Sequence, residues 1–464
     1  MKADGGKGPC FWGAFEGTKD EEIGVSLATP EQIRRLQRKL YAKAKERPEL
    51  RFHQLYDKVY REDILRHAYR LARHNGGAPG VDGVTFEDIE AQGLEAWLSG
   101  LKEDLHAKTY QPAAVRRVMI PKPGGGERPL GIPTIRDRVA QTAAKLVMEP
   151  IFEADFEDCA YGYRPKRDAL DAVKDVHRKV CEGYSEVVDA DLTKFFDTIP
   201  HHALMQSVAR RICDRHLLQL VKQWLKVPVE ERDEHGRRRM TGGKKSRRGT
   251  PQGGVVSPLL ANIYMHRYLR AWRERKKGEQ FQAHIVNYAD DFVILSRGHA
   301  EEALAWTRWA MEQIGLELNG TKTCIRNARR ESFDFLGYTF GPERHRQDGH
   351  WYLSAKPSKK SVARLKEHVH AILQPANVAP WPEVAQRLNR VLRGWANYFS
   401  HGTRLMAYRA IDNYVCRGVQ CFLQRRHKVP SRGTRQFTAE RIFGELGVQR
   451  LRTLHVGSLT TAST

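Results

Sequence analysis

The sequence predicts a mixed α+β fold that becomes almost wholly helical toward its C-terminal end. Three stretches have the apolar pattern of strands, at residues 186–192, 285–295 and 333–340, and helical patterns lie between them. After residue 358, apolar residues recur at helical spacing, as at Leu388, Leu392 and Trp395. Sheet and helix are therefore mixed rather than strictly alternating, which is typical of an α+β core.

Charge indicates a polyanionic partner. The 464 residues include 78 Lys and Arg against 55 Asp and Glu, a formal net charge of +23. The hydrophobic share of 41% is enough for a folded core, so the chain differs from a disordered basic tail. A nucleic acid or an anionic membrane fits this sign of charge. No stretch has the ~18 uninterrupted apolar residues of a spanning helix, and the first residues lack a signal-peptide pattern, so we expect a soluble cytoplasmic protein.

The seven cysteines are scattered singly, and no C-x2-C pair occurs. This odd number without pairing motifs indicates free thiols in a reducing compartment rather than a disulfide framework or a structural zinc site.

Further helices and a strand are predicted in the following order along the chain. Basic amphipathic helices are predicted from Pro30 to Asn75 and end at the glycine- and proline-rich residues 76–80. A strand at 115–120 then leads into a tight basic turn, and a helix is expected over residues 136–152. Further helical patterns occupy residues 259–272 and 303–313.

Three carboxylates stand at strand ends. Asp191 closes one strand, and Asp290 with Asp291 forms an acidic turn between two apolar arms. Such an arrangement could bring the three side chains to one sheet edge, where Mg²⁺ takes carboxylate and phosphate oxygens. Two such ions would suit nucleotidyl transfer. An Asp-Asp pair taken alone also marks ordinary turns.

Two polar loops contain further candidate binding residues. Residues 249–258 are rich in glycine around Gln252 and Gly253, and small residues there would let a base pair approach the backbone. Lys122 and Arg128 flank three glycines, which suits a triphosphate. An ordinary capped loop and a solvated hairpin are the alternatives.

Tyr288-Ala289-Asp290-Asp291 and its apolar arms resemble the active-site motif of reverse transcriptases. Other blocks stand around it in family order, at residues 77–83, 121–133, 161–165, 189–199, 249–258, 315–319 with Lys322, and 335–338. Together they resemble the bacterial group II intron-encoded reverse transcriptases and maturases, over about residues 76–399. The resemblance implies a right-hand polymerase with fingers and palm, preceded by basic helices and followed by a helical thumb and maturase domain.

The resemblance implies a role for each matching residue. Asp191 and Asp290 would ligate two Mg²⁺ ions, with Asp291 as the third catalytic carboxylate and the Leu192 carbonyl completing one shell. Lys322 would protonate the leaving pyrophosphate.

Substrate selection follows from the same resemblance. Phe196 matches the aromatic gate that excludes a ribose 2′-hydroxyl, so the substrate would be a dNTP. Lys122 and Arg128 would hold its triphosphate, Gln252 and Gly253 would line the pocket of the templating pair, and residues 335–338 would grip the primer.

The implied domains are an N-terminal extension over 1–75, fingers and palm over 76–340, thumb and maturase domain over 341–424, and a basic tail over 425–464 that could bind DNA. The predicted function is RNA-directed DNA synthesis together with binding of group II intron RNA to assist splicing and mobility. A DNA primer or target is the second expected partner, and monomer and dimer both remain open.

Trp395, Tyr398 and Phe399 are predicted to be core aromatics, and the basic cluster formed by residues 237–239 and 244–248 is predicted to contact RNA phosphates.

The chain also departs from the family pattern. Lys194 stands where many relatives carry glycine before the paired aromatics. We also expect no HNH endonuclease domain, so mobility would need a primer other than a self-made nick. Two other functions are considered: a reverse transcriptase of a CRISPR-associated or phage-defence system, and a splicing factor with an inert palm. The intact aspartates argue against the second.

Overall fold

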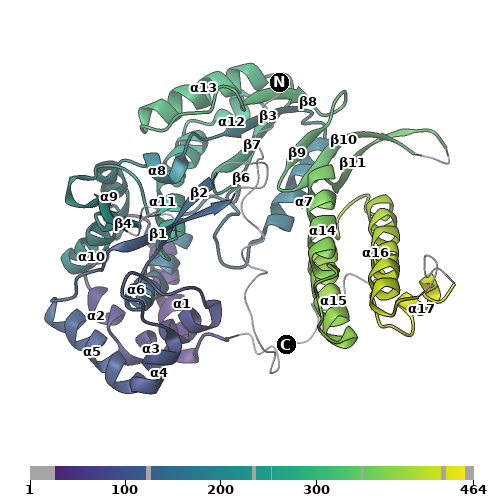
Figure 1. The fold of residues 1–464 in the computed structure, drawn as a ribbon. Helices are drawn as coiled ribbons and strands as arrows, with labels where there is room; N and C mark the ends of the chain where they lie inside the picture. The colour runs from purple at the N-terminus through teal and green to yellow at the C-terminus, as the bar shows by residue number, and fades with distance from the viewer. Residues whose placement is uncertain are drawn as a thin grey trace. The chain divides into compact units, whose positions relative to one another are not determined.

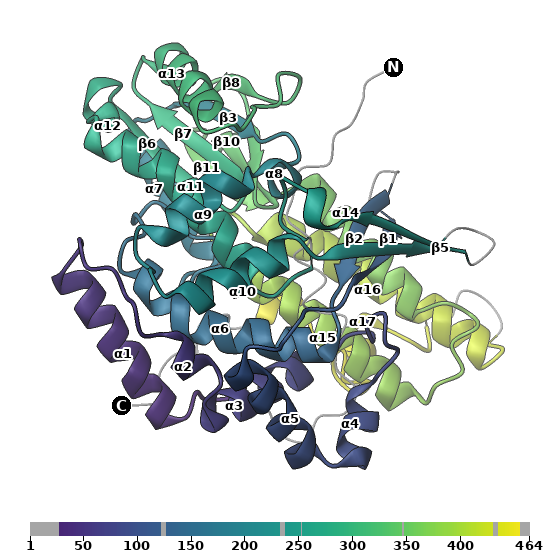
Figure 2. The same cartoon turned by 90° about the vertical axis from the view of Figure 1, so that its left-hand side faces the viewer.

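The computed structural model describes residues 27–121, 127–232, 237–251, 253–345, 348–429 and 435–454. The chain folds into two compact units. The first comprises the chain up to Asp168 together with Val188–Cys324, and the second comprises Ala169–Val187 and the chain from Ile325 onward. The fold is mixed α and β, as predicted (Figures 1 and 2).

Six helices form the N-terminal part of the first unit. They are α1 (Glu31–Glu46), α2 (Tyr56–Val59), α3 (Glu62–Asn75), α4 (Phe86–Gln92), α5 (Leu94–Ala107) and α6 (Ile135–Glu153). The predicted basic helices are confirmed, and α3 ends at Gly76, whose φ of 61° lies in the region that favours glycine. Most of α6 is buried because α1, α2 and α3 pack around it (Figure 2).

A second layer of the first unit is a four-stranded sheet with the order β2-β1-β4-β5. Its strands are β1 (Val115–Pro121), β2 (Glu127–Ile132), β4 (Pro228–Arg232) and β5 (Arg238–Gly242). β1 pairs antiparallel with β2 and parallel with β4, while β4 and β5 form a hairpin that ends in the short 3-10 helix η2 (Gly243–Lys245). Two helices precede β4, namely α9 (His201–Ala209) and α10 (Arg215–Leu225).

The acidic residues belong to another sheet, with the order β6-β7-β3-β8. Its strands are β6 (Ala283–Tyr288), β7 (Asp291–Ser296), β3 (Glu186–Asp191) and β8 (Cys324–Asn327), and the division into units passes through β3 and β8. The continuous apolar run of β7 reflects burial on both faces. One face meets helices α11 (Ser257–Glu274) and α13 (Ala300–Gln313), because Tyr268 contacts Phe292 and its hydroxyl hydrogen-bonds Thr307 at 2.9 Å. Short helices α8 (Phe195–Thr198) and α12 (Lys277–Gln280) complete this unit.

The second unit contains helix α7 (Ala169–Cys181) and a three-stranded sheet with the order β11-β10-β9. The strands are β9 (Phe333–Phe335), β10 (Tyr338–Arg344) and β11 (Trp351–Pro357). The prediction of one strand over residues 333–340 is therefore wrong. Leu336 and Gly337 both have positive φ, 48° and 81°, so they form the centre of a type I′ turn that folds this stretch into a hairpin.

Helices form the rest of the second unit, as predicted. They are α14 (Lys359–Ile372), α15 (Trp381–Tyr398), α16 (Leu405–Arg426), α17 (Ala439–Phe443) and the 3-10 helix η3 (Leu451–Thr453). Trp395 and Phe399 are 1% and 3% exposed, which confirms them as core aromatics.

The described part of the basic tail packs onto these helices. The Trp381 indole N–H donates to the Leu446 carbonyl at 3.0 Å, and the Asn389 amide donates to the Gly447 carbonyl at 2.7 Å. Residues 435–454 are thus an integral part of the helical unit, and DNA binding by the tail stays a prediction.

Six of the seven cysteines lie in the described ranges, and all six are free thiols, as expected. Cys10 lies outside them. Within those ranges, no helix combines the length and apolarity that crossing a bilayer requires.

Candidate active site

The acidic turn is a two-residue hairpin connection. Tyr288 pairs with Asp291 across β6 and β7, so Ala289 and Asp290 are the two central residues of the turn. Ala289 has φ of 59°, at the position where the type II′ hairpin turn ordinarily takes glycine. A side chain in this region costs roughly 1 kcal/mol, so the rest of the structure has to hold the turn in place.

Asn287 supplies one such restraint. Its side chain is 1% exposed, and its amide Nδ2 donates to the Ala289 carbonyl at 2.9 Å. On the backbone, the Asn287 N–H donates to the Cys159 carbonyl at 2.8 Å, and the Tyr161 N–H donates to the Asn287 carbonyl at 2.8 Å. The chain before Gly162 therefore runs along β6 as an additional short parallel bridge.

Gly162 lies directly against the turn. A Cβ atom on this residue would be 2.5 Å from the Ala289 nitrogen, which no side chain tolerates. Asn262 of α11 fixes Gly162 from the other direction, because its amide donates to the Gly162 carbonyl at 2.7 Å within the core. The turn is thus clamped between Asn287 and the Gly162 backbone.

Asp191 is the last residue of β3, and β3 is the hydrogen-bonded neighbour of β7. Its carboxylate, 15% exposed, lies 3.3 Å from the Lys322 ammonium. The backbone is held as well: the Asp191 carbonyl accepts from the Asn319 N–H at 2.8 Å, and Leu192 forms an antiparallel bridge with Leu318. The structure therefore brings Asp191 and Lys322 together, although 131 positions separate them in the sequence.

Phe196 is buried on α8, where it is 8% exposed. Its ring meets Phe195 and Tyr163 edge to face, with centroids 5.6 and 6.4 Å away. The Phe196 carbonyl accepts from the Thr250 N–H at 2.7 Å. The aromatic residue and the glycine-rich loop are therefore joined directly through the backbone.

His201 makes a second link between these two segments. Its Nε2 donates to the Gly249 carbonyl at 2.6 Å, and its backbone N–H donates to the Arg247 carbonyl at 2.9 Å. Burial lowers the pKa of the His201 imidazole below its usual value of 6.5, so the neutral ring makes this bond at physiological pH.

Helix α6 and strand β2 hold the other end of the glycine-rich loop. The Val256 N–H donates to the Gln141 side-chain oxygen at 3.3 Å. Gly253 has φ of 105°, and a Cβ on it would lie 2.0 Å from the Gly131 carbonyl oxygen. The protein itself therefore needs glycine at position 253, because β2 passes against it.

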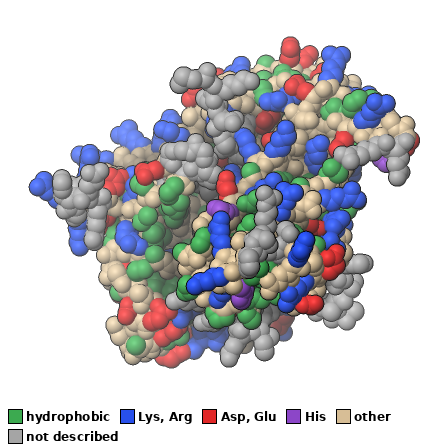
Figure 3. Space-filling model, turned by 45° about the vertical axis from the view of Figure 1, so that its right-hand side comes forward, with side chains coloured by type: hydrophobic (Ala, Val, Ile, Leu, Met, Phe, Trp, Pro, Cys, Tyr) green, Lys and Arg blue, Asp and Glu red, His purple; other side chains and the backbone are tan. Residues whose placement is uncertain are grey.

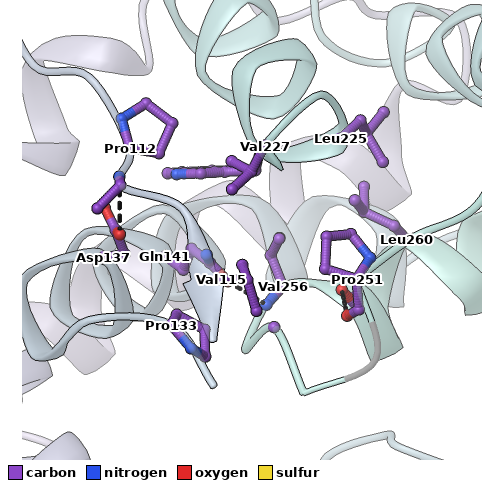
Figure 4. Close-up of a pocket in the computed structure, with 14 residues that line it drawn as sticks. Pro112, Val115, Pro133, Asp137, Gln141, Leu225, Val227, Pro251, Val256 and Leu260 are labelled. Atoms are coloured by element: carbon purple, nitrogen blue, oxygen red, sulfur yellow. Dashed lines mark hydrogen bonds between the residues drawn. The ribbon is translucent and has the colours of Figure 1, made fainter. Parts of the chain in front are cut away.

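The cavity beneath this loop is only a small gap between packed side chains. Figure 4 shows Gln141 of α6 beside Val115 and Val256, with Asp137 and Pro251 at opposite sides of the cavity. The Ala113 N–H donates to the Asp137 carboxylate at 3.1 Å. Its volume of about 10 Å³ is at the lower limit for one water molecule. A larger open groove lies between the β2-β1-β4-β5 sheet and the same loop. Its lining includes Arg117, Gly131, Asp197, Arg248 and Thr250.

Some predicted site residues lie outside the description. Lys122 and Gln252 are not among the described residues. The backbone of Arg128 is described, and it pairs with Ile120 near the end of the β1–β2 hairpin. Sequence reasoning did not single out Asn287, Asn262 or His201. A polar residue within the apolar arm of β6 was the available signal for Asn287.

Comparison with known proteins identifies the family to which the chain belongs. Residues 120–340 match the family "Reverse transcriptase (RNA-dependent DNA polymerase)", and residues 362–439 match "Group II intron, maturase-specific domain". Protein YkfC of Escherichia coli K12 is 34% identical in an alignment of 366 positions that covers 71% of this chain and 93% of YkfC. The group II intron-encoded protein LtrA of Lactococcus lactis is 29% identical over 67% of this chain, which spans 60% of LtrA.

Among solved structures, telomerase from Candida albicans is similar with a TM-score of 0.41 and 13% identity, over 78% of this chain and 68% of that one. The two family matches follow one another in the chain, the first over the strands that carry the aspartates and the second over α14 to α16. The chain is therefore an RNA-directed DNA polymerase with a maturase-specific domain, and it belongs to the family of group II intron-encoded reverse transcriptases.

Proposed function

We propose that the protein extends a DNA primer on an RNA template, with Asp191, Asp290 and Asp291 holding two Mg²⁺ ions. The observation that carries this proposal is the placement of the aspartates: Asp191 ends one strand, and the neighbouring strand begins with the Asp290–Asp291 turn. Carboxylate oxygens are the donors that Mg²⁺ prefers, so the residues fit these ions. When bound, two such ions would favour loss of the proton from the attacking 3′-hydroxyl and stabilise the negative charge on the leaving pyrophosphate.

The chain's own groups then position the reactants. Lys322, 3.3 Å from Asp191, is close enough to this edge to donate a proton to the pyrophosphate, and the Leu192 carbonyl provides a further oxygen ligand. The clamp on Ala289 keeps Asp290 in one place, so that the carboxylates do not have to reorganise when substrate enters.

We assign nucleotide selection to Phe196 and to the glycine-rich loop that is hydrogen-bonded to its carbonyl. We infer that the Phe196 ring borders the substrate sugar and excludes a 2′-hydroxyl, which would make the substrate a dNTP. Lys122 and Arg128 hold the triphosphate, while Gln252 and Gly253 border the templating pair. The bond from Thr250 to the Phe196 carbonyl supports this assignment, because it ties the sugar gate to the template loop.

Binding of group II intron RNA is the second half of the proposal, in support of splicing and mobility. Lys and Arg side chains are spread over the surface in Figure 3, in keeping with the net charge of +23. The exposed cations at Lys244, Lys245 and Arg247 stand beside the template loop and are assigned to RNA phosphates. We expect the protein to be in the cytoplasm, bound to this RNA and to its DNA primer or target.

The test is primer extension on an annealed RNA template with purified protein, Mg²⁺ and dNTPs. Asp290→Ala is expected to abolish incorporation while the affinity for structured RNA changes less than twofold, because one metal ligand is lost and no cation is removed. Asp57→Ala, an exposed carboxylate on α2, is the matched control and should retain full activity. Equal loss of RNA affinity and incorporation in Asp290→Ala would overturn this division of roles. Tight RNA binding without extension by the wild type would favour an inert splicing factor.

A further inference from the structure

The hairpin of β10 and β11 extends beyond the sheet to which it belongs. β9 pairs with β10 only from Phe333 to Phe335, whereas β10 and β11 remain paired as far as Arg344 and Trp351. The outer half of the hairpin is therefore a two-stranded arm, a kind of structure that is marginally stable in water by itself (Figure 1). Past the last ladder pair, the His345 N–H still donates to the His350 carbonyl at 2.8 Å.

Three potential metal ligands converge at the end of this arm. The Nδ1 atoms of His345 and His350 lie 2.7 and 2.6 Å from the same carboxylate oxygen of Asp348. All three ligand atoms are within 4.8 Å of one another. The two imidazole rings are stacked, with centroids 5.0 Å apart. His345 directly follows β10 and His350 directly precedes β11, and the backbone bond between the two residues keeps them opposite each other.

A hydrogen-bonded turn explains only part of this geometry. The Asp348 carboxylate accepts from the His350 N–H at 3.3 Å, which is an ordinary turn contact. For both rings to hydrogen-bond the same oxygen, each must also carry its proton on Nδ1. A bound cation removes that requirement, because both neutral rings and the carboxylate then present lone pairs to one centre.

The donor set selects the type of ion. Two imidazole nitrogens and one carboxylate oxygen suit Zn²⁺ and its neighbours in the first transition row, whereas Mg²⁺ prefers oxygen alone. Ligands around such an ion, at bond lengths of about 2.0–2.2 Å, are separated by roughly 3 Å. The side chains are 41%, 56% and 59% exposed for His345, Asp348 and His350, so an ion reaches them from solvent and small rotations open the required gap.

We propose that His345, Asp348 and His350 form a binding site for a divalent transition-metal ion such as Zn²⁺, which cross-links β10 to β11 at the end of the arm. This site is separate from the proposed magnesium site in residues, donor type and structural unit. Its effect is mechanical: an ion bound to both strands stabilises the pairs that β9 does not support.

Isothermal titration of the full-length protein with Zn²⁺ tests binding. His345→Ala/His350→Ala is compared with His368→Ala/His370→Ala, which removes the same number of imidazoles from α14, where residues two apart do not face each other. The first variant is expected to lose one equivalent of Zn²⁺ that the wild type and the control bind with micromolar affinity. Asp348→Asn should weaken that equivalent at least tenfold. Equal stoichiometry in all four proteins would overturn the proposal.

Hydrogen exchange tests the cross-link independently of catalysis. Zn²⁺ should slow amide exchange in residues 341–345 and 348–354 at least threefold in the wild type and in the His368→Ala/His370→Ala control, and Mg²⁺ should not. The side chains of His345, Asp348 and His350 are at least 41% exposed at a hairpin end, so variants at these positions should keep the wild-type melting temperature, which is checked first. Binding without slowed exchange would contradict the mechanical role, and slowing that persists in His345→Ala/His350→Ala would place the ion elsewhere.

Discussion

At the scale of single residues, the position of the acidic turn depends on side chains that do no chemistry. Ala289 occupies a backbone region where glycine is usual, and Asn287 and Gly162 restrain it from two directions. The amide of Asn287 is buried, so its hydrogen bond is not exchanged readily for one with water.

Asn287→Ala tests this clamp. We expect the Mg²⁺ concentration for half-maximal primer extension to rise about tenfold, because Asp290 is no longer held in position. Ser296→Ala is the matched control: Ser296 is equally buried and donates to the Phe281 carbonyl at 2.9 Å, but at the opposite end of the same hairpin. Titration of Mg²⁺ in single-nucleotide extension separates the two, since both variants lose stability and only Asn287→Ala should shift the Mg²⁺ requirement. An equal shift in both would mean that general destabilisation is responsible.

Lys194 is a second residue whose backbone lies in the left-handed region that favours glycine. Its φ of 45° is left-handed and its side chain is exposed, so little packing offsets the strain. Lys194→Gly should raise the free energy of unfolding by about 0.5 kcal/mol, since the relieved strain exceeds the extra entropy of glycine in the unfolded chain. Thermal melting measures this change, and a lower melting temperature would show that the lysine makes a stabilising contact.

At the scale of elements, α11 connects the glycine-rich loop to the core against the β6–β7 hairpin. It begins at Ser257 beside that loop, presents Asn262 to Gly162, and carries the half-buried His266 one turn later. Burial, with Arg273 and Arg164 nearby, lowers the pKa of His266 from 6.5 to about 4. The folded protein thus holds this ring neutral.

A pH dependence follows from His266. Because its folded pKa lies below its unfolded pKa, the stabilisation is complete above pH 6.5 and is lost as pH falls toward 4. Relative to His266→Gln, the wild type should lose about 1.4 kcal/mol of stability per pH unit within that window. Unfolding in urea at pH 7.0, 6.0 and 5.0 measures the difference, which should stay constant if His266 does not titrate there.

At the scale of the whole molecule, charge rather than shape predicts how RNA binding responds to salt. Each neutralised phosphate contributes about 0.7–0.9 to the slope of log affinity against log salt. Lys244→Gln/Lys245→Gln should therefore reduce that slope by about 1.5 for structured RNA. Arg329→Gln/Arg330→Gln removes the same net charge from exposed positions after β8 and should leave the slope nearly unchanged. Filter binding between 50 and 300 mM KCl measures both, and equal reductions would point to a diffuse effect of net charge.

The sequence by itself determined the elements and the chemistry. Periodicity identified the basic helices, the long α6 and the helical C-terminal unit, because burial of one face requires those spacings. The apolar arms around Asp290 and Asp291 identified a hairpin and its acidic turn. The prediction of a single strand over residues 333–340 was wrong, because aromatic residues are typical of strands on both sides of the turn. The residue type of Leu336 does not indicate its positive φ.

The tertiary structure decided which distant residues meet. Lys322 faces Asp191, Thr250 bonds to the Phe196 carbonyl, and Gly253 is packed against Gly131. None of these pairs is local, so no spacing along the chain could express them. His345, Asp348 and His350 are close in the chain, but their convergence also depends on how β10 and β11 are paired. Local patterns follow from burial of single elements, whereas these contacts follow from how elements pack, which is a property of the folded chain.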